Sequence, residues 1–255
     1  MKKLSITIWL GLIINLIFLW VIFYCAQLWQ TTPDSLTNEE KTIFEMFSVI
    51  TMPMAISIGM QAISVLLLFF HRKLALFLAV LSSFITLPWG LVYIIGFIFS
   101  YNNFRFAEFQ LFNLENRKQL SFYVSFRSGY FYLMAGVLTL LGIFQLIMGV
   151  SMGGMLIGVA IVSLFNGIRL TNRPVLGIYG DQLVITPSPF SKTYQVSSKQ
   201  VTMKKKGKNT ISFLIQTDSL KETVKIKRNL IKTTDDAGID EIEEIEKKLT
   251  KQGSL

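Results

Sequence analysis

The chain is 255 residues long; 51% of its residues are hydrophobic and only 16% are charged, against about 25% charged residues in a typical soluble domain. The mean hydropathy is +0.49 and the formal net charge is +9. This composition excludes an ordinary soluble protein. The single cysteine, Cys25, excludes an intramolecular disulfide, and the single histidine, His71, excludes a metal site built from several histidines.

Five hydrophobic segments are long enough to cross a membrane, which takes roughly 20 mainly apolar residues. None of them has Asp, Glu, Lys or Arg in its central part. The first is too long for the apolar part of a signal peptide and no small-residue cleavage site follows it, so we expect a retained helix. The predicted spans cover residues 4–28, 44–70, 74–101, 129–150 and 152–169.

The distribution of Lys and Arg predicts the orientation, because cytoplasmic loops are enriched in both. With five spans the two termini face opposite sides. An external N-terminus leaves only four of the 25 basic residues outside and places the C-terminus in the cytoplasm, so this arrangement is favoured. The four residues are Lys2, Lys3, Arg72 and Lys73. Pro88 predicts a kink in the third span, and a re-entrant segment there would return the N-terminus to the inside.

The stretch 102–128 mixes aromatic and charged residues, with Phe106 and Phe109 close to Arg105 and Glu108. Such a mixture is typical of an amphipathic segment that lies along a bilayer. A linker packed on a soluble domain has the same composition. We therefore expect here either an interfacial linker or a linker packed on the soluble domain.

After residue 173 the apolar blocks give way to short alternating stretches bounded by turn residues, as in β-strands. The predicted strands cover 175–179, 183–185, 193–196, 201–206, 210–216 and 223–227, with turns at Gly180-Asp181 and Gly207-Lys208-Asn209. A helix follows at about 236–251, because the apolar residues there fall on one helical face: Ile239, Ile242, Ile245 and Leu249. The expected fold is a five-span helical bundle followed by a small β-rich barrel plugged by that helix.

Four parts follow from these patterns. They are a three-span module over 1–101, an amphipathic interfacial linker over 102–128, a two-span hairpin over 129–170 and a cytoplasmic domain over 171–255.

Three features of the C-terminal half carry a family resemblance. Residues 122–128 form an aromatic and basic lead-in to the two-span hairpin, the hairpin runs directly into 169–178, and 180–185 has the form of a first β-turn-β. In this layout residues 116–255 resemble bacterial membrane proteins with a C-terminal pleckstrin-homology-like (PH-like) domain. The chain differs at Lys199-Gln200-Val201, where family members often carry a Trp-Asp-Ile-like step. The resemblance implies a PH-like domain after the hairpin.

No catalytic motif is present, and the predicted spans hold no ionisable group at membrane depth, as an intramembrane enzyme or pump normally requires. We expect no enzyme activity, no cofactor and no metal. The uncharged polar residues within the spans predict hydrogen bonds between helices, or else the lining of a permeation path. Those expected to support helix packing are Asn15, Gln61 and Gln145, together with Gly154 and Gly158 of a G-x-x-x-G pattern.

The most concentrated positive charge is a lysine cluster in the predicted hairpin, Lys204, Lys205, Lys206 and Lys208. Residues 169–232 hold 13 Lys or Arg and 3 acidic residues. A basic surface held beside a bilayer attracts anionic head groups by roughly 1 kcal/mol per residue. The cluster is therefore a candidate lipid-binding site, or else a solvated turn. Nucleic acid is not expected, because no aromatic stacking platform accompanies the lysines.

We therefore expect a non-enzymatic, multi-pass protein of a bacterial cell membrane, whose cytoplasmic domain binds lipid, a protein or a peptide. By the family resemblance, self-immunity against a bacteriocin is the most concrete role. A transporter or exporter accessory subunit, and a membrane-anchored sensory or regulatory protein, are the alternatives. The sequence leaves the oligomeric state open.

Overall fold

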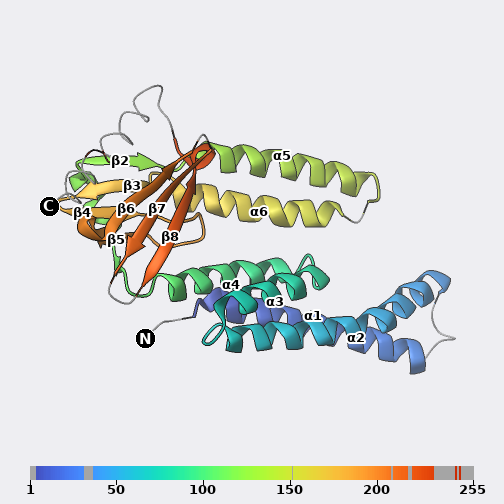
Figure 1. The fold of residues 1–255 in the computed structure, drawn as a ribbon. Helices are drawn as coiled ribbons and strands as arrows, with labels where there is room; N and C mark the ends of the chain where they lie inside the picture. The colour runs from blue at the N-terminus through green and yellow to red at the C-terminus, as the bar shows by residue number, and fades with distance from the viewer. Residues whose placement is uncertain are drawn as a thin grey trace. The chain divides into compact units, whose positions relative to one another are not determined.

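The computed structural model describes residues 4–31, 37–150, 152–207, 209–217, 220–232, 245 and 247, with only the backbone of Trp29, Lys205 and Lys206. The chain divides into two compact units, Met1–Arg105 and Phe106–Leu255. The first unit is helical (Figure 1). The second combines two helices with two antiparallel sheets.

Four helices form the first unit: α1 (Ile6–Thr31), α2 (Asn38–Leu67), α3 (Arg72–Ile85) and α4 (Gly90–Arg105). The start of α2 is fixed by a capping box, in which Thr37 accepts a hydrogen bond from the Glu40 N–H and the Glu40 carboxylate accepts one from the Thr37 N–H. Helices α1 and α2 pack on each other, α4 packs on α1, and α3 packs on α2.

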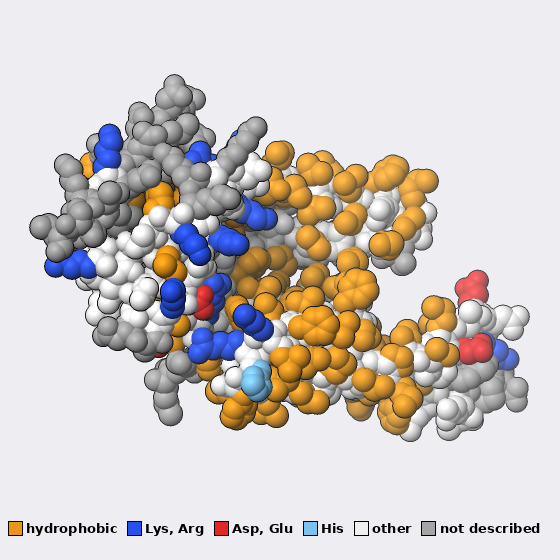
Figure 2. All heavy atoms as spheres, in the orientation of Figure 1, with side chains coloured by type: hydrophobic (Ala, Val, Ile, Leu, Met, Phe, Trp, Pro, Cys, Tyr) orange, Lys and Arg blue, Asp and Glu red, His pale blue; other side chains and the backbone are white. Residues whose placement is uncertain are grey.

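Four helices among the described residues are long and apolar enough to cross a membrane, and α3 and α4 are not among them. The four are Ile6–Leu28 of α1, Asn38–Leu67, Ser128–Ile147 and Gly153–Leu170. Figure 2 shows hydrophobic side chains over the helices, whereas Lys and Arg gather on the β-rich part. A multi-pass membrane protein is therefore supported.

The predicted third span, 74–101, is wrong, because the chain turns back within it. Helix α3 has 14 residues and α4 has 16, which at about 1.5 Å per residue makes each shorter than a hydrocarbon core of roughly 30 Å. The two are separated by a turn at residues 86–89 that contains Pro88. Proline has no N–H to continue the helical ladder. The sequence showed this interruption and left open a kink or a re-entrant segment; in the structure the chain reverses there.

Helix α4 runs antiparallel to α1, as contacts along its length show. The Ser5 N–H donates to Ser100 Oγ at 2.8 Å, and the Phe18 ring packs on Trp89 with 5.0 Å between centroids. At the other end of the hairpin, Phe69 after α2 packs on Phe104 at 5.0 Å. Helix α3 therefore begins, and α4 ends, at the end of the unit where α1 begins. The turn lies beside Phe18, about 18 Å along α1 and so roughly half-way.

The second unit contains the helical hairpin α5 (Ser128–Ile147) and α6 (Gly153–Leu170), which lie side by side (Figure 1). One sheet has the order β1-β5-β4-β3-β2 and the other the order β6-β7-β8, with all neighbours antiparallel. The strands are β1 (Gln110–Leu111), β2 (Phe122–Ser125), β3 (Pro174–Tyr179), β4 (Gln182–Ile185), β5 (Tyr194–Ser197), β6 (Val201–Lys206), β7 (Thr210–Gln216) and β8 (Lys221–Lys227).

The predicted antiparallel, β-rich C-terminal region is confirmed, but a closed barrel is not found. The short 3-10 helix Ser198–Gln200 ends β5 and leads into β6, which belongs to the other sheet. Among the described residues, a single bridge between Phe126 and Ile231 lies outside the named strands. The backbone therefore leaves one ladder and starts another, so the two sheets stay separate.

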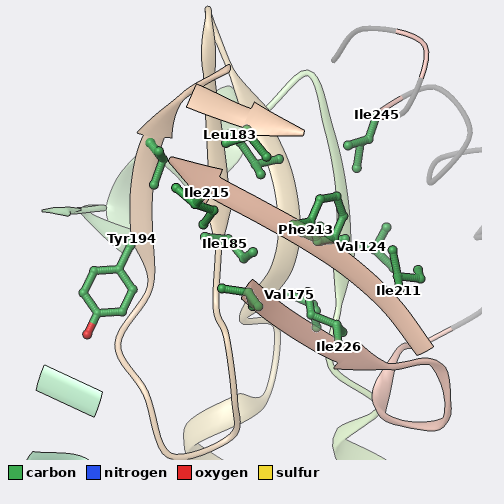
Figure 3. Packing of buried hydrophobic residues seen from close by; sticks show 14 of the residues in the cluster. Val124, Val175, Leu183, Ile185, Tyr194, Ile211, Phe213, Ile215, Ile226 and Ile245 are labelled. Atoms are coloured by element: carbon green, nitrogen blue, oxygen red, sulfur yellow. The ribbon is translucent and has the colours of Figure 1, made fainter. Parts of the chain in front are cut away.

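Side chains from both sheets share one hydrophobic core (Figure 3). Leu183 and Ile185 of the first sheet and Phe213 of the second are fully buried in it. Ile245 and Lys247 are the described members of the predicted C-terminal helix, and both are helical. Ile245 is fully buried in the same core. The other apolar residues of that helix, Ile239, Ile242 and Leu249, lie outside the described residues.

The stretch predicted as an interfacial linker, 102–128, contributes instead to the β-rich unit from Phe106 onward. Phe106 and Phe109 are buried in its core. Strand β1 pairs with β5, and β2 pairs with β3. The aromatic residues that suggested a bilayer surface therefore face a protein core, and the β-rich unit begins well before residue 171.

Candidate functional site

Two of the predicted packing residues, Asn15 and Gln61, meet at the turn of the α3–α4 hairpin. The Asn15 side-chain amide donates to Gln61 Oε1 at 2.8 Å, and Gln61 Nε2 donates to Thr86 Oγ1 at 3.0 Å. Asn15 and Gln61 are fully buried, and Thr86 is almost so. One amide side chain on α2 thus links α1 to the hairpin turn.

Further hydrogen bonds surround this link. The Tyr93 hydroxyl donates to the Gln61 carbonyl at 2.8 Å and contacts the Ser64 hydroxyl at 2.5 Å, while Ser57 Oγ donates to the Ser82 carbonyl at 2.7 Å. The spacing of Ser57, Gln61 and Ser64 on one face of α2 was visible in the sequence. Their partners on α3, α4 and the turn were not.

The network holds neutral donors and acceptors that bond mainly to one another. Such bonds tie helices together inside a membrane. Asn15 Oδ1 is the one buried side-chain atom of the network without a partner among the described residues. This arrangement supports a structural role, in which the network holds the hairpin against α1 and α2. It favours that role rather than the lining of a permeation path.

Replacing Gln61 with leucine is expected to destabilise the first unit by about 1–3 kcal/mol, because it leaves the buried Asn15 amide and Thr86 hydroxyl without their partner. The measurement is thermal unfolding of the detergent-solubilised chain, followed by tryptophan fluorescence. Gln27→Leu on the exposed side of α1 is the matched control and should melt like the wild type. Equal melting temperatures for Gln61→Leu and Gln27→Leu would contradict a supporting role for the network.

Gly154, one of the predicted glycine pair, does not lie where α5 and α6 approach each other. Gly154 is exposed, with open space around the position of a Cβ. The close approach is made by Gly142 and Gly153, since a Cβ on Gly153 would lie 2.4 Å from the Gly142 carbonyl oxygen. Gly158 is partly buried on α6. Gln145 on α5 is partly buried too, and its Oε1 has no partner among the described residues.

The candidate lipid-binding lysines follow β6 into its hairpin with β7. Lys204 is exposed. The backbone of Lys205 pairs with Ser212 and that of Lys206 with Ile211, while Lys208 lies outside the described residues. The Gly207 N–H donates to the Thr210 carbonyl at 2.9 Å and closes the hairpin. The structure thus brings the backbone of Lys204, Lys205 and Lys206 to one end of the second sheet.

The end of α6 is joined firmly to the β-rich unit. Arg169 donates through one Nη to the Pro189 carbonyl at 2.7 Å and through the other to the Ser191 carbonyl at 2.6 Å. Arg173, just before β3, donates from Nε to Thr193 Oγ1 at 2.9 Å. These bonds hold the loop between β4 and β5 against the helix end. Sequence reasoning gave neither arginine a role, since their partners lie about twenty residues away.

A polar hollow of about 460 Å³ opens at the edge of the first sheet, and none of the predicted site residues lines it. Gln195 donates to Gln110 across it at 2.9 Å. His71 lies on the turn before α3, beside Arg72 and Lys73. Within the described part of the chain, no three of His, Cys, Asp and Glu come together as a metal site would need.

Comparison with protein-family models, with curated proteins and with solved structures gives no match for this chain.

Proposed function

We propose that the chain is a non-enzymatic, multi-pass protein of a bacterial cell membrane that presents a binding domain at the cytoplasmic surface. The observation that carries this proposal is the continuity of sheet and membrane hairpin. Strand β2 leads into α5 and α6 leads into β3, and β2 and β3 pair with each other. The β-rich unit is therefore attached to the membrane at two adjacent strands, with the Arg169 bonds as a third link.

A four-span arrangement supports a cytoplasmic β-rich unit. If α1, α2, α5 and α6 cross the membrane and α3–α4 re-enters from the side on which it leaves, both termini lie on one side. Lys41 is then the only one of the 25 Lys and Arg residues on the opposite side. Four acidic residues accompany it there, Asp34, Glu39, Glu40 and Glu45. This bias is stronger than in the five-span arrangement and favours a cytoplasmic location of both termini.

The PH-like character of the β-rich unit is part of the same proposal. Two antiparallel sheets over one core, with Ile245 of a helical segment buried in that core, support it. A fold of this kind does not by itself determine a function, so the function has to be argued from a particular site on it. The site proposed from charge is the lysine cluster of the β6–β7 hairpin, and its ligand is the anionic surface of the inner leaflet.

Binding to liposomes tests the proposed ligand. The probe is a soluble β-rich unit, in which residues 106–127 are joined to 172–255 by a short Gly-Ser linker in place of the helical hairpin. We expect it to bind vesicles of phosphatidylglycerol, in a salt-sensitive manner, and not vesicles of phosphatidylcholine. Changing Lys204, Lys205, Lys206 and Lys208 to Gln should weaken this binding strongly.

The matched control changes four other lysines to Gln, Lys118, Lys192, Lys199 and Lys221, so that the net charge is the same in both variants. Equal binding by the two variants would show that the cluster is not a site. Failure of the unsubstituted unit to bind either vesicle would contradict lipid as its ligand.

A further inference from the structure

Two arginines and a tyrosine meet where α6 passes into β3. Arg169 lies in the last turn of α6, Arg173 immediately precedes β3, and Tyr194 begins β5. Both guanidinium groups lie close enough to the Tyr194 phenol, and to each other, to interact electrostatically. All three side chains belong to the second unit.

The Tyr194 hydroxyl is a buried donor without an acceptor. The residue is 3% exposed, and its ring packs on Phe106 at 5.4 Å and on Phe109 at 6.0 Å between centroids. Figure 3 shows the ring pointing away from the other labelled core residues, with the hydroxyl outermost. The backbone of Lys192 approaches the oxygen without forming a hydrogen bond, and no described residue accepts the proton. Burial raises the pKa of Tyr194 to about 12, so the hydroxyl keeps its proton at neutral pH.

Arg173 is also incompletely satisfied. Its Nε bonds to Thr193, and within the described part of the chain its two Nη groups make no hydrogen bond. Burial lowers its pKa, and among the described residues the interaction that opposes this effect comes from Tyr194. The Arg173 guanidinium therefore keeps Nη donors that no described residue accepts, and a second cation, Arg169, lies beside it. Such a cluster, with an unpaired hydroxyl beside it, fits an anion with several acceptor oxygens.

We infer that this junction binds the phosphate of an anionic phospholipid head group. Arg173 donates to it from its Nη groups and Tyr194 from its hydroxyl, while Arg169 adds a second positive charge. The phosphate comes from lipid because the site lies at the end of a helix long enough to span the bilayer, which ends at Leu170. Residues that follow such a helix lie at the level of the head groups.

This inference rests on the proposed multi-pass insertion of the chain, but the two fail differently. Without insertion of its helices the chain would leave the membrane fraction. Without the phosphate site it would stay there and lose only a preference among lipids. The site also uses none of the lysines of the β6–β7 hairpin.

The test is the thermal stability of the full chain in nanodiscs of phosphatidylcholine, with and without phosphatidylglycerol. We expect phosphatidylglycerol to raise the melting temperature of the wild type, and of the control Lys199→Gln, whose side chain is exposed elsewhere on the unit. Tyr194→Phe and Arg173→Gln should lose this gain. In a lipid titration in detergent, each should shift the midpoint roughly tenfold, as expected for a lost hydrogen bond to a charged group.

Tyr194→Phe also controls for folding. It removes only a hydroxyl without a partner, so in phosphatidylcholine alone it should melt no lower than the wild type. A full phosphatidylglycerol gain in Tyr194→Phe would overturn the inference. So would an equal gain when inorganic phosphate, rather than anionic lipid, is added to phosphatidylcholine nanodiscs, because the ligand would then be a free anion.

Discussion

Replacing Gly96 with leucine is expected to detach α4 from α1 and destabilise the first unit by about 3 kcal/mol or more, at the upper end for overpacking a core. A Cβ on Gly96 would lie 2.4 Å from the Ile8 backbone nitrogen, and one on Gly11 would lie 2.4 Å from the Tyr93 Cα. These neighbours are backbone atoms, which cannot rotate away as the end of a side chain can. The two helices must therefore separate to admit any larger residue.

The melting temperature of the solubilised chain measures this effect, and the tryptophan spectrum adds a local signal, because Trp89 at the hairpin turn packs on Phe18. Gly59→Leu is the matched control. Gly59 lies on α2 with nothing within 4 Å of a Cβ, so the same substitution there should leave the melting temperature nearly unchanged. If Gly96→Leu melts like Gly59→Leu, α4 does not pack on α1 as described.

A fragment of residues 171–255 is expected not to fold, although the sequence suggested a domain with these bounds. It lacks β1 and β2, and with them the buried Phe106, Phe109 and Val124. Loss of large core side chains costs about 3–5 kcal/mol for each phenylalanine, which approaches the whole stability of a small domain. Circular dichroism and a denaturant titration should therefore show no cooperative unfolding.

The unit with 106–127 joined to 172–255 should fold, because the hairpin enters and leaves at paired positions. The Phe126 N–H donates to the Arg173 carbonyl at 3.2 Å, so a short linker can connect the two strands. Val124→Asp in this fused unit is the control, since a charge at a residue only 1% exposed should prevent folding. Cooperative unfolding of 171–255 alone would contradict the role given to β1 and β2.

The sequence predicted local structure well where the alternation of residues along a strand and the residues of its turn determine that structure. Strands β6 and β7 were predicted with the bounds they have, because alternating residues flank a glycine-containing turn. Strands β1 and β2 were missed, since β1 has only two residues and both pair with strands about fifty or more residues away. Pairing over such distances leaves no periodic signal in a short segment.

Long-range geometry explains the other differences. The apolar content of 74–101 is that of a span, and only the contacts of α4 with α1 show that the chain reverses at the turn containing Pro88. Asn15 and Gln61 were chosen as polar residues in apolar helices, and the structure joins them directly. Arg173 and Tyr194 were not chosen, because their relation exists only once β3 and β5 flank β4 in one sheet.

Cysteine accessibility tests most directly whether α3 and α4 form a re-entrant hairpin that enters and leaves on the cytoplasmic side. Single cysteines replace Glu39, Lys73 or Lys118, all exposed, in a Cys25→Ser background, and a membrane-impermeant maleimide is applied to intact cells. The four-span arrangement predicts labelling of Glu39→Cys in intact cells, and of Lys73→Cys and Lys118→Cys only after permeabilisation. Labelling of Lys73→Cys and Lys118→Cys from opposite sides would show that 74–101 crosses the membrane, and would contradict the re-entrant hairpin.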